Sequence, residues 1–161
     1  MIQLLPYDRR AAVAYAHKWA YGRNPAYYDF SEIGGDCTNF ASQCLYAGSG
    51  IMNWTPVAGW FYANPGYRSA AWSAVEYLYK FLTENKGAGP YAIVAGPGDL
   101  EPGDLVQLSF GGGIYSHCPV VQAVRGGEIL VAAHSFDAVR RPLSSYRYVS
   151  ARYLHIQGVR K

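Results

Sequence analysis

The 161-residue sequence has few charged residues and no long hydrophobic run. Only 16% of its residues are charged and 50% are hydrophobic, so the chain can bury enough apolar surface to fold and is not a disordered segment. Its apolar stretches are too short to span a membrane, and the N-terminal residues lack the apolar core of a secretory signal. The sequence therefore excludes a visible membrane span and leaves the localisation open.

Clusters of basic residues are also absent, although the net charge is +3. A nucleic-acid-binding surface normally needs such a cluster, so we expect no nucleic-acid partner. The three cysteines, Cys37, Cys44 and Cys118, are an odd number and leave at least one thiol free. They also fall short of the four soft ligands of a structural zinc site, and we expect neither a metal nor another cofactor.

The spacing of apolar residues predicts helices in the first half of the chain and strands in the second. We expect helices over 7–21, 37–47 and 70–86, and strands over 105–110, 118–124, 128–133 and 153–157. Asp8 is the expected cap of the first helix and Gly48 the expected end of the second, while residues 89–103 are expected to be a connection. This order predicts one α+β domain over residues 1–161, with N-terminal helices packed on a small antiparallel sheet.

Cys37 is the candidate nucleophile because it is expected in the first turn of the second helix. The positive end of the helix dipole lowers a thiol pKa there, and Gly34 and Gly35 let a substrate approach the sulfur closely. Backbone amides of the same turn, including that of Thr38, are candidate donors to an oxyanion. Cys44 lies on the buried stripe of this helix and is expected to be a core residue.

Two of the four histidines are candidates to assist the thiol. His117 follows a glycine-rich stretch and begins a strand, and His134 ends the next strand. His17, inside a helix, and His155, in the last strand, are expected to have structural or surface roles. A thiol, a base and a group that orients the base are the usual set for nucleophilic acyl transfer.

The hairpin between these two strands predicts which group orients His117. If Gly126–Gly127 forms a two-residue turn, His134 lies opposite Pro119, on the sheet face that also carries His117. His117 and His134 are then diagonal neighbours, whereas Asp137 belongs to the other face. The register therefore favours His134 over Asp137, although a bulge would reverse this parity.

Further polar and aromatic residues have weaker claims to the site. Asp36 precedes the thiol and is expected to cap the helix, because a negative charge beside a thiol raises its pKa instead of activating it. Tyr27 or Tyr28 is a candidate hydroxyl donor to the oxyanion. Trp60 is a candidate for lining the cleft, since Tyr and Trp suit sugar or peptide binding, although they fit a packed core equally well.

Four segments, GGDCTNFASQCL, PGDLVQL, SHCPVV and HSFDAVRRPLSSY, together resemble the putative amidase domain family of bacteria. The resemblance extends from about Tyr21 to Tyr153. That family is similar to CHAP amidases and NlpC-type cell-wall peptidases, so the resemblance implies a papain-like fold. It also implies that Cys37 is the nucleophile, His117 the base and His134 the polar residue on the following strand.

The function implied by the resemblance is hydrolysis of an amide bond in peptidoglycan, either between muramic acid and the stem peptide or within the peptide. Pro119 departs from the family pattern and removes one ladder hydrogen bond from its strand. Two other functions stay open: a wall-binding or protein-binding module without activity, and an acyltransferase that uses the same thiol. The sequence does not indicate an oligomeric state.

Overall fold

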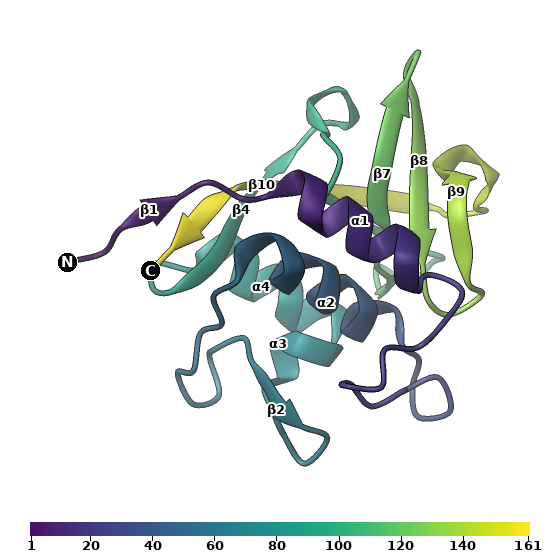
Figure 1. Cartoon of the computed structure of the whole chain (residues 1–161). Helices are drawn as coiled ribbons and strands as arrows, with labels where there is room; N and C mark the ends of the chain where they lie inside the picture. The colour runs from purple at the N-terminus through teal and green to yellow at the C-terminus, as the bar shows by residue number, and fades with distance from the viewer.

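The computed structural model describes residues 1–161 and has helices packed on one face of an eight-stranded antiparallel sheet (Figure 1). The helices are α1 (Arg9–Trp19), α2 (Cys37–Ser49), α3 (Ala70–Ser73) and α4 (Val75–Glu84), with short 3₁₀ turns η1 (Pro97–Asp99) and η2 (Leu143–Ser145). The strands are β1 (Leu4–Leu5), β2 (Tyr62–Asn64), β3 (Tyr67–Arg68), β4 (Gly89–Ala95), β5 (Leu105–Ser109), β6 (Tyr115–His117), β7 (Val120–Arg125), β8 (Glu128–Ala133), β9 (Ala138–Pro142) and β10 (Ser150–Arg160). The predicted α+β class is confirmed.

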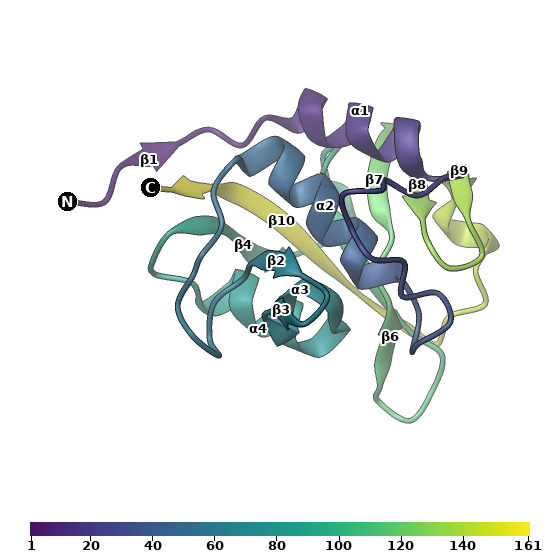
Figure 2. The same ribbon diagram turned by 60° about the horizontal axis from the view of Figure 1, so that its bottom comes forward.

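The sheet has the strand order β1-β10-β5-β7-β8-β9, with β4 paired to β10 and β6 paired to β5. Strands β2 and β3 form a separate hairpin. The long strand β10 joins the two parts of the sheet, because its first half pairs with β5 and its second half with β4 and β1. Both chain termini lie at the β1–β10 end (Figures 1 and 2), where Gln3 and Lys161 exchange backbone hydrogen bonds of 2.9 Å.

The first two helices are close to their predicted positions. The Asp8 side chain caps α1 as expected, accepting the Ala11 amide at 3.0 Å. The expected end of α2 at Gly48 is wrong, because the helix continues to Gly50, whose φ of 66° forms a left-handed cap. Gly48 instead allows α2 to pack closely against the segment that precedes α1: a Cβ at this position would lie 2.5 Å from the Tyr7 ring.

Two further expectations are corrected by the backbone. The helix predicted over 70–86 is two helices, because Ala74 has an extended conformation (φ −125°, ψ 128°). Residues 89–95, expected to lie in a connection, form β4, whose backbone pairs with β10. The predicted strands also do not include β1, β2, β3, β6 or β9.

The predicted turn at Gly126–Gly127 is confirmed, and Arg125 pairs with Glu128. Further along this hairpin, however, a bulge at Gln122 shifts the register by one residue, so that Val120 pairs with Ala132. An uninterrupted ladder would pair Val120 with Ala133. Because one residue of slip moves a side chain to the other face, this bulge reverses the parity expected for His134.

Two hydrophobic clusters lie on opposite faces of the sheet. Along β5, Leu105 belongs to the cluster beneath the helices, while Val106 and Leu108 belong to the cluster beneath η2. The alternation follows from the two-residue period of a strand. The two clusters hold the N-terminus of α2 and the strands β6 and β8 in fixed relative positions, and these elements carry the candidate site.

Candidate active site

Cys37 is the first residue of α2, and its sulfur faces strand β6. The side chain is largely buried, and the sulfur lies 3.7 Å from the Thr38 hydroxyl and 3.8 Å from the Ser116 carbonyl oxygen. Cys44 and Cys118 are fully buried and, like Cys37, are free thiols. Unlike these two buried thiols, Cys37 lines a pocket, where a substrate can reach a nucleophile.

The electrostatic setting of Cys37 differs from the expectation. Burial raises the pKa of the Cys37 thiol, and the neighbouring Asp36 carboxylate acts in the same direction. The Thr38 hydroxyl and the backbone amides of Thr38 and Cys118 oppose this by favouring the thiolate. Desolvation therefore outweighs the helix N-terminus, and the resting thiol is protonated at neutral pH.

His117 ends β6 and packs beside the ring of Tyr146, with the ring centroids 5.4 Å apart. The pKa of His117 is lowered to about 4, mainly by burial and in addition by the nearby Arg141 guanidinium, which disfavours a second positive charge. The imidazole is accordingly neutral at neutral pH. A neutral imidazole is the form that can accept a proton from a thiol.

One pocket of about 580 Å³ contains both Cys37 and His117. Its other lining residues are Gly34, Gly35, Phe110, Ser116, Ser135, Phe136, Arg141, Ser145, Tyr146 and Arg147. No hydrogen bond joins the Cys37 sulfur to the His117 ring, since the sulfur contacts Thr38 and Ser116 and the ring faces Tyr146. The fold thus brings the two residues to one cavity and leaves the resting side chains apart.

His134 is not hydrogen-bonded to His117, which corrects the predicted role of orienting it. Its Nδ1 lies 2.6 Å from a carboxylate oxygen of Asp36, and its Nε2 lies 2.9 Å from the Trp19 carbonyl oxygen and 3.0 Å from Arg23. The ring is also stacked on Phe40, with centroids 4.1 Å apart. The bulge described above explains the difference, because it turns this end of the hairpin by one residue.

Asp36 occupies the N-cap position of α2, but its carboxylate does not cap the helix. One oxygen accepts hydrogen bonds from the Phe30 amide and the Asn39 side chain, and the other faces His134. The Asp36 amide donates to the Ser135 hydroxyl at 3.1 Å. The expected capping contact is therefore wrong, and the residue before the nucleophile is instead fixed to β8 and the loop after it.

A basic residue not singled out in the sequence, Arg23, completes this cluster. It forms ion pairs with Asp29 and Asp137, at 3.2 and 3.0 Å, and its Nη1 contacts His134. The Asp137 charge is therefore matched by Arg23, and Asp137 has no contact with His117. The position of Arg23 in the sequence did not identify it as a site residue, because the loop that carries it meets these partners only in the folded chain.

The remaining predicted site residues have different placements. Thr38 is buried with its hydroxyl beside the Cys37 sulfur. Tyr28 does not line the pocket, and its exposed ring packs edge-on against Phe30, 4.9 Å between centroids. The expectation that Trp60 lines the cleft is wrong: the ring is fully buried in the core, and its Nε1 donates to Ser42.

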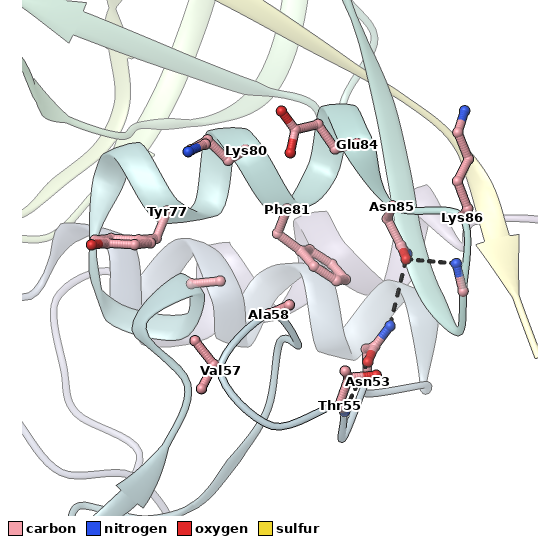
Figure 3. A pocket seen from close by; sticks show the side chains of 12 residues that line it. Asn53, Thr55, Val57, Ala58, Tyr77, Lys80, Phe81, Glu84, Asn85 and Lys86 are labelled. Carbon is pink, nitrogen blue, oxygen red and sulfur yellow. Dashed lines mark hydrogen bonds between the residues drawn. The ribbon is translucent and has the colours of Figure 1, made fainter.

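A second cavity, of about 450 Å³, lies between α4 and the loop that contains Asn53 (Figure 3). It has no cysteine or histidine in its lining. Its amide side chains are occupied internally, since Asn53 donates to the Ala88 carbonyl oxygen and Asn85 to the Pro90 carbonyl oxygen, both at 3.0 Å. These residues support the loop and offer no nucleophile.

No three His, Cys, Asp or Glu side chains are grouped as metal ligands. The helices are also too short or too polar to cross a bilayer.

Comparison with known proteins gives a family match over nearly the whole chain. The model of the putative amidase domain matches residues 6–157. The uncharacterized protein YhbB of Bacillus subtilis (strain 168) is 36% identical over 139 residues, which cover 84% of this chain and 43% of that protein. The chain thus spans less than half the length of this relative, and no solved structure matches it significantly.

Proposed function

Because this chain belongs to the putative amidase domain family, which suggests amide hydrolysis in general, we propose that it is a cysteine-dependent amide hydrolase. Cys37 is the nucleophile and His117 the base. The observation that carries the proposal is the shared pocket, which joins a thiol at a helix N-terminus to an uncharged imidazole on the adjacent sheet. In this proposal residues 1–161 act as a single papain-like domain.

The reaction begins with transfer of the thiol proton to the His117 ring as the sulfur attacks the amide carbonyl carbon. The carbonyl oxygen gains negative charge, which first-turn amides of α2 stabilise. These amides do not donate to an N-cap side chain, because the Asp36 carboxylate is turned toward His134. The imidazolium then protonates the leaving amine, and water cleaves the resulting thioester to regenerate the thiol.

Proton transfer requires the His117 ring to come within hydrogen-bonding reach of the sulfur. Strand β6 has a hydrogen-bonded neighbour on one side only, β5, and follows the glycine-rich segment 111–113. The strand that carries His117 is thus held less firmly than the central strands. In the proposed mechanism, the ring turns from Tyr146 toward Cys37 when substrate fills the pocket.

His134 contributes as a positioning residue in this mechanism. Its contact with Asp36 fixes the peptide immediately before Cys37, and the Ser135 hydroxyl holds the same peptide through its amide. Deviations of about an ångström in a nucleophile are costly to catalysis, so a rigid support for this residue is expected in an enzyme. The proposed set is therefore Cys37 and His117, with His134 acting through Asp36.

The proposed substrate is peptidoglycan, cut either at the bond between muramic acid and the stem peptide or within the peptide. This part of the proposal is supported by the similarity of the sequence motifs to those of cell-wall amidases and peptidases. The two bonds are distinguished by mass spectrometry of the released fragments, because only the first cleavage separates sugar from peptide.

The mechanism is tested by alkylation with iodoacetamide followed by peptide mapping. We expect Cys37 to be modified first and amide hydrolysis to be lost in step with its modification, since Cys44 and Cys118 are completely buried. Activity that survives complete and selective modification of Cys37 would contradict the proposal. An added amine that appears in the products would show acyl transfer in place of hydrolysis.

A binding module without activity is the second candidate, and the resting geometry favours it in one respect. The sulfur has no hydrogen bond to the His117 ring, and burial raises its pKa. If this candidate is right, the wild type and Cys37→Ala sediment equally with insoluble peptidoglycan, and neither releases fragments from it.

A further inference from the structure

The pocket that contains Cys37 is lined by two arginines and by no acidic residue. Arg141 lies on β9 and Arg147 follows η2. Two acidic residues adjoin the pocket wall in sequence, but neither lines the cavity: Asp36 faces His134, and Asp137 is paired with Arg23. The charge of the cavity wall is therefore positive beside the nucleophile.

Neither arginine is engaged with a carboxylate of the protein. Arg9, Arg23 and Arg152 each form an ion pair, but Arg141 and Arg147 form none. Arg147 is exposed and has no side-chain partner. The pocket thus holds two guanidinium groups whose usual anionic partner is not supplied by the chain.

Arg141 is held in place for such a partner. Its Nε donates to the Ser145 hydroxyl at 2.8 Å and its Nη2 to the Ser145 carbonyl oxygen, while the guanidinium plane lies over the Tyr146 ring at 3.6 Å. The remaining nitrogen, Nη1, has no acceptor in the structure. A guanidinium fixed by its neighbours loses less entropy when it binds an anion than a free side chain does.

We propose that Arg141 and Arg147 form a subsite for a carboxylate of the substrate, so that the enzyme selects amides that carry a free carboxylate near the cleaved bond. This inference rests on the proposed function and specifies its substrate class. Planar guanidinium groups match carboxylate geometry, and an acidic peptide would supply that group. Whether the carboxylate is a side chain or a peptide C-terminus is distinguished by peptides that carry only one of them.

A carboxylate bound in this subsite would also change the basicity of His117. Burial, and with it the charge of Arg141, disfavours protonation of His117, so the resting imidazole is a weak base. A carboxylate bound to Arg141 offsets that positive charge and makes the imidazole a stronger proton acceptor. An anionic substrate would then promote the proton transfer that its own hydrolysis needs.

The subsite is tested with two alkylating reagents that differ in charge, iodoacetate and iodoacetamide. For each protein, the rate of Cys37 alkylation by iodoacetate is divided by the rate with iodoacetamide. This ratio is then divided by the same ratio measured with free cysteine, which corrects for the different intrinsic reactivities of the two reagents. We expect the wild type to favour iodoacetate. The normalised ratio should fall by about tenfold in the Arg141→Gln/Arg147→Gln variant, because clefts of one charge concentrate oppositely charged reagents.

Two further variants separate this subsite from the overall charge. Arg10→Gln removes an exposed positive charge from α1, outside the pocket, and should leave the ratio unchanged. Arg141→Lys keeps the charge and should retain most of the preference. A ratio near one in the wild type, or an equal fall in Arg10→Gln, would overturn the subsite even if Cys37 reacts rapidly and the hydrolase proposal stands.

A binding measurement keeps the subsite testable if Cys37 reacts with neither reagent. His117 is followed by NMR in Cys37→Ala during titration with N-acetylglycylglycine and with its uncharged amide. The carboxylate peptide should raise the pKa of His117, the amide should not, and Arg141→Gln should abolish the difference. Equal effects of the two peptides would overturn the subsite.

Discussion

The contact between Asp36 and His134 gives a sharp prediction, because both side chains are almost completely buried and only 2.6 Å apart. Replacing His134 with Phe keeps an aromatic ring stacked on Phe40 and removes the hydrogen bond. One Asp36 oxygen then retains only Arg23, at 3.8 Å. A buried carboxylate oxygen that loses its close hydrogen-bond partner costs about 3 kcal/mol, so we expect the free energy of unfolding to fall by about that amount.

The assay is urea unfolding, followed by tryptophan fluorescence, of the wild type, His134→Phe, Asp36→Asn and the double variant. The double variant contains neither member of this hydrogen bond, so the losses of the two single variants should not add, and the coupling energy should be about 2 kcal/mol. Cys37 alkylation should also change, because Asp36 precedes it, while the pKa of His117 should not. A coupling energy below about 0.5 kcal/mol, or a shifted pKa of His117, would refute the positioning role.

Three further predictions follow from individual contacts. Gly48→Ala should destabilise the fold by about 1–3 kcal/mol in urea unfolding, because its Cβ would lie 2.5 Å from Tyr7; unchanged stability would contradict the close packing. Asp8→Ala should lower the unfolding free energy by about 1 kcal/mol through loss of the α1 cap, and Asp8→Asn should retain most of it. For His117, the folded pKa of about 4 lies below the unfolded 6.5, so the unfolded state binds more protons between these values. Stability should therefore fall by about 3 kcal/mol as the pH is lowered from 6.5 to 4, and NMR should show a higher pKa in Arg141→Gln.

Local patterns were sufficient to predict the elements that rest on short-range rules. The Asp8 cap, the two-glycine turn and the position of Cys37 at the start of a helix all follow from neighbouring residues. Strand β4 was not predictable in this way, because its pairing partner β10 is distant in sequence and its composition includes Gly and Pro. Gly48 also looked like a helix end, and only the position of Tyr7 shows why it is glycine.

The candidate site was predicted in part for the same reason. The shared pocket of Cys37 and His117 agrees with the sequence proposal, whereas the partner of His134 does not. A single bulged residue at Gln122 changed the strand register, and no local pattern marked it. The raised pKa of the thiol is likewise a property of burial, which depends on the whole fold.

The central claim is that Cys37 forms the covalent intermediate in amide hydrolysis. Its most direct test is the rate at which purified peptidoglycan fragments are cleaved by the wild type and by Cys37→Ala, with new amino groups measured over time. We predict cleavage by the wild type and none by Cys37→Ala, with both proteins showing the same unfolding transition. Cleavage by Cys37→Ala at the wild-type rate would contradict the claim.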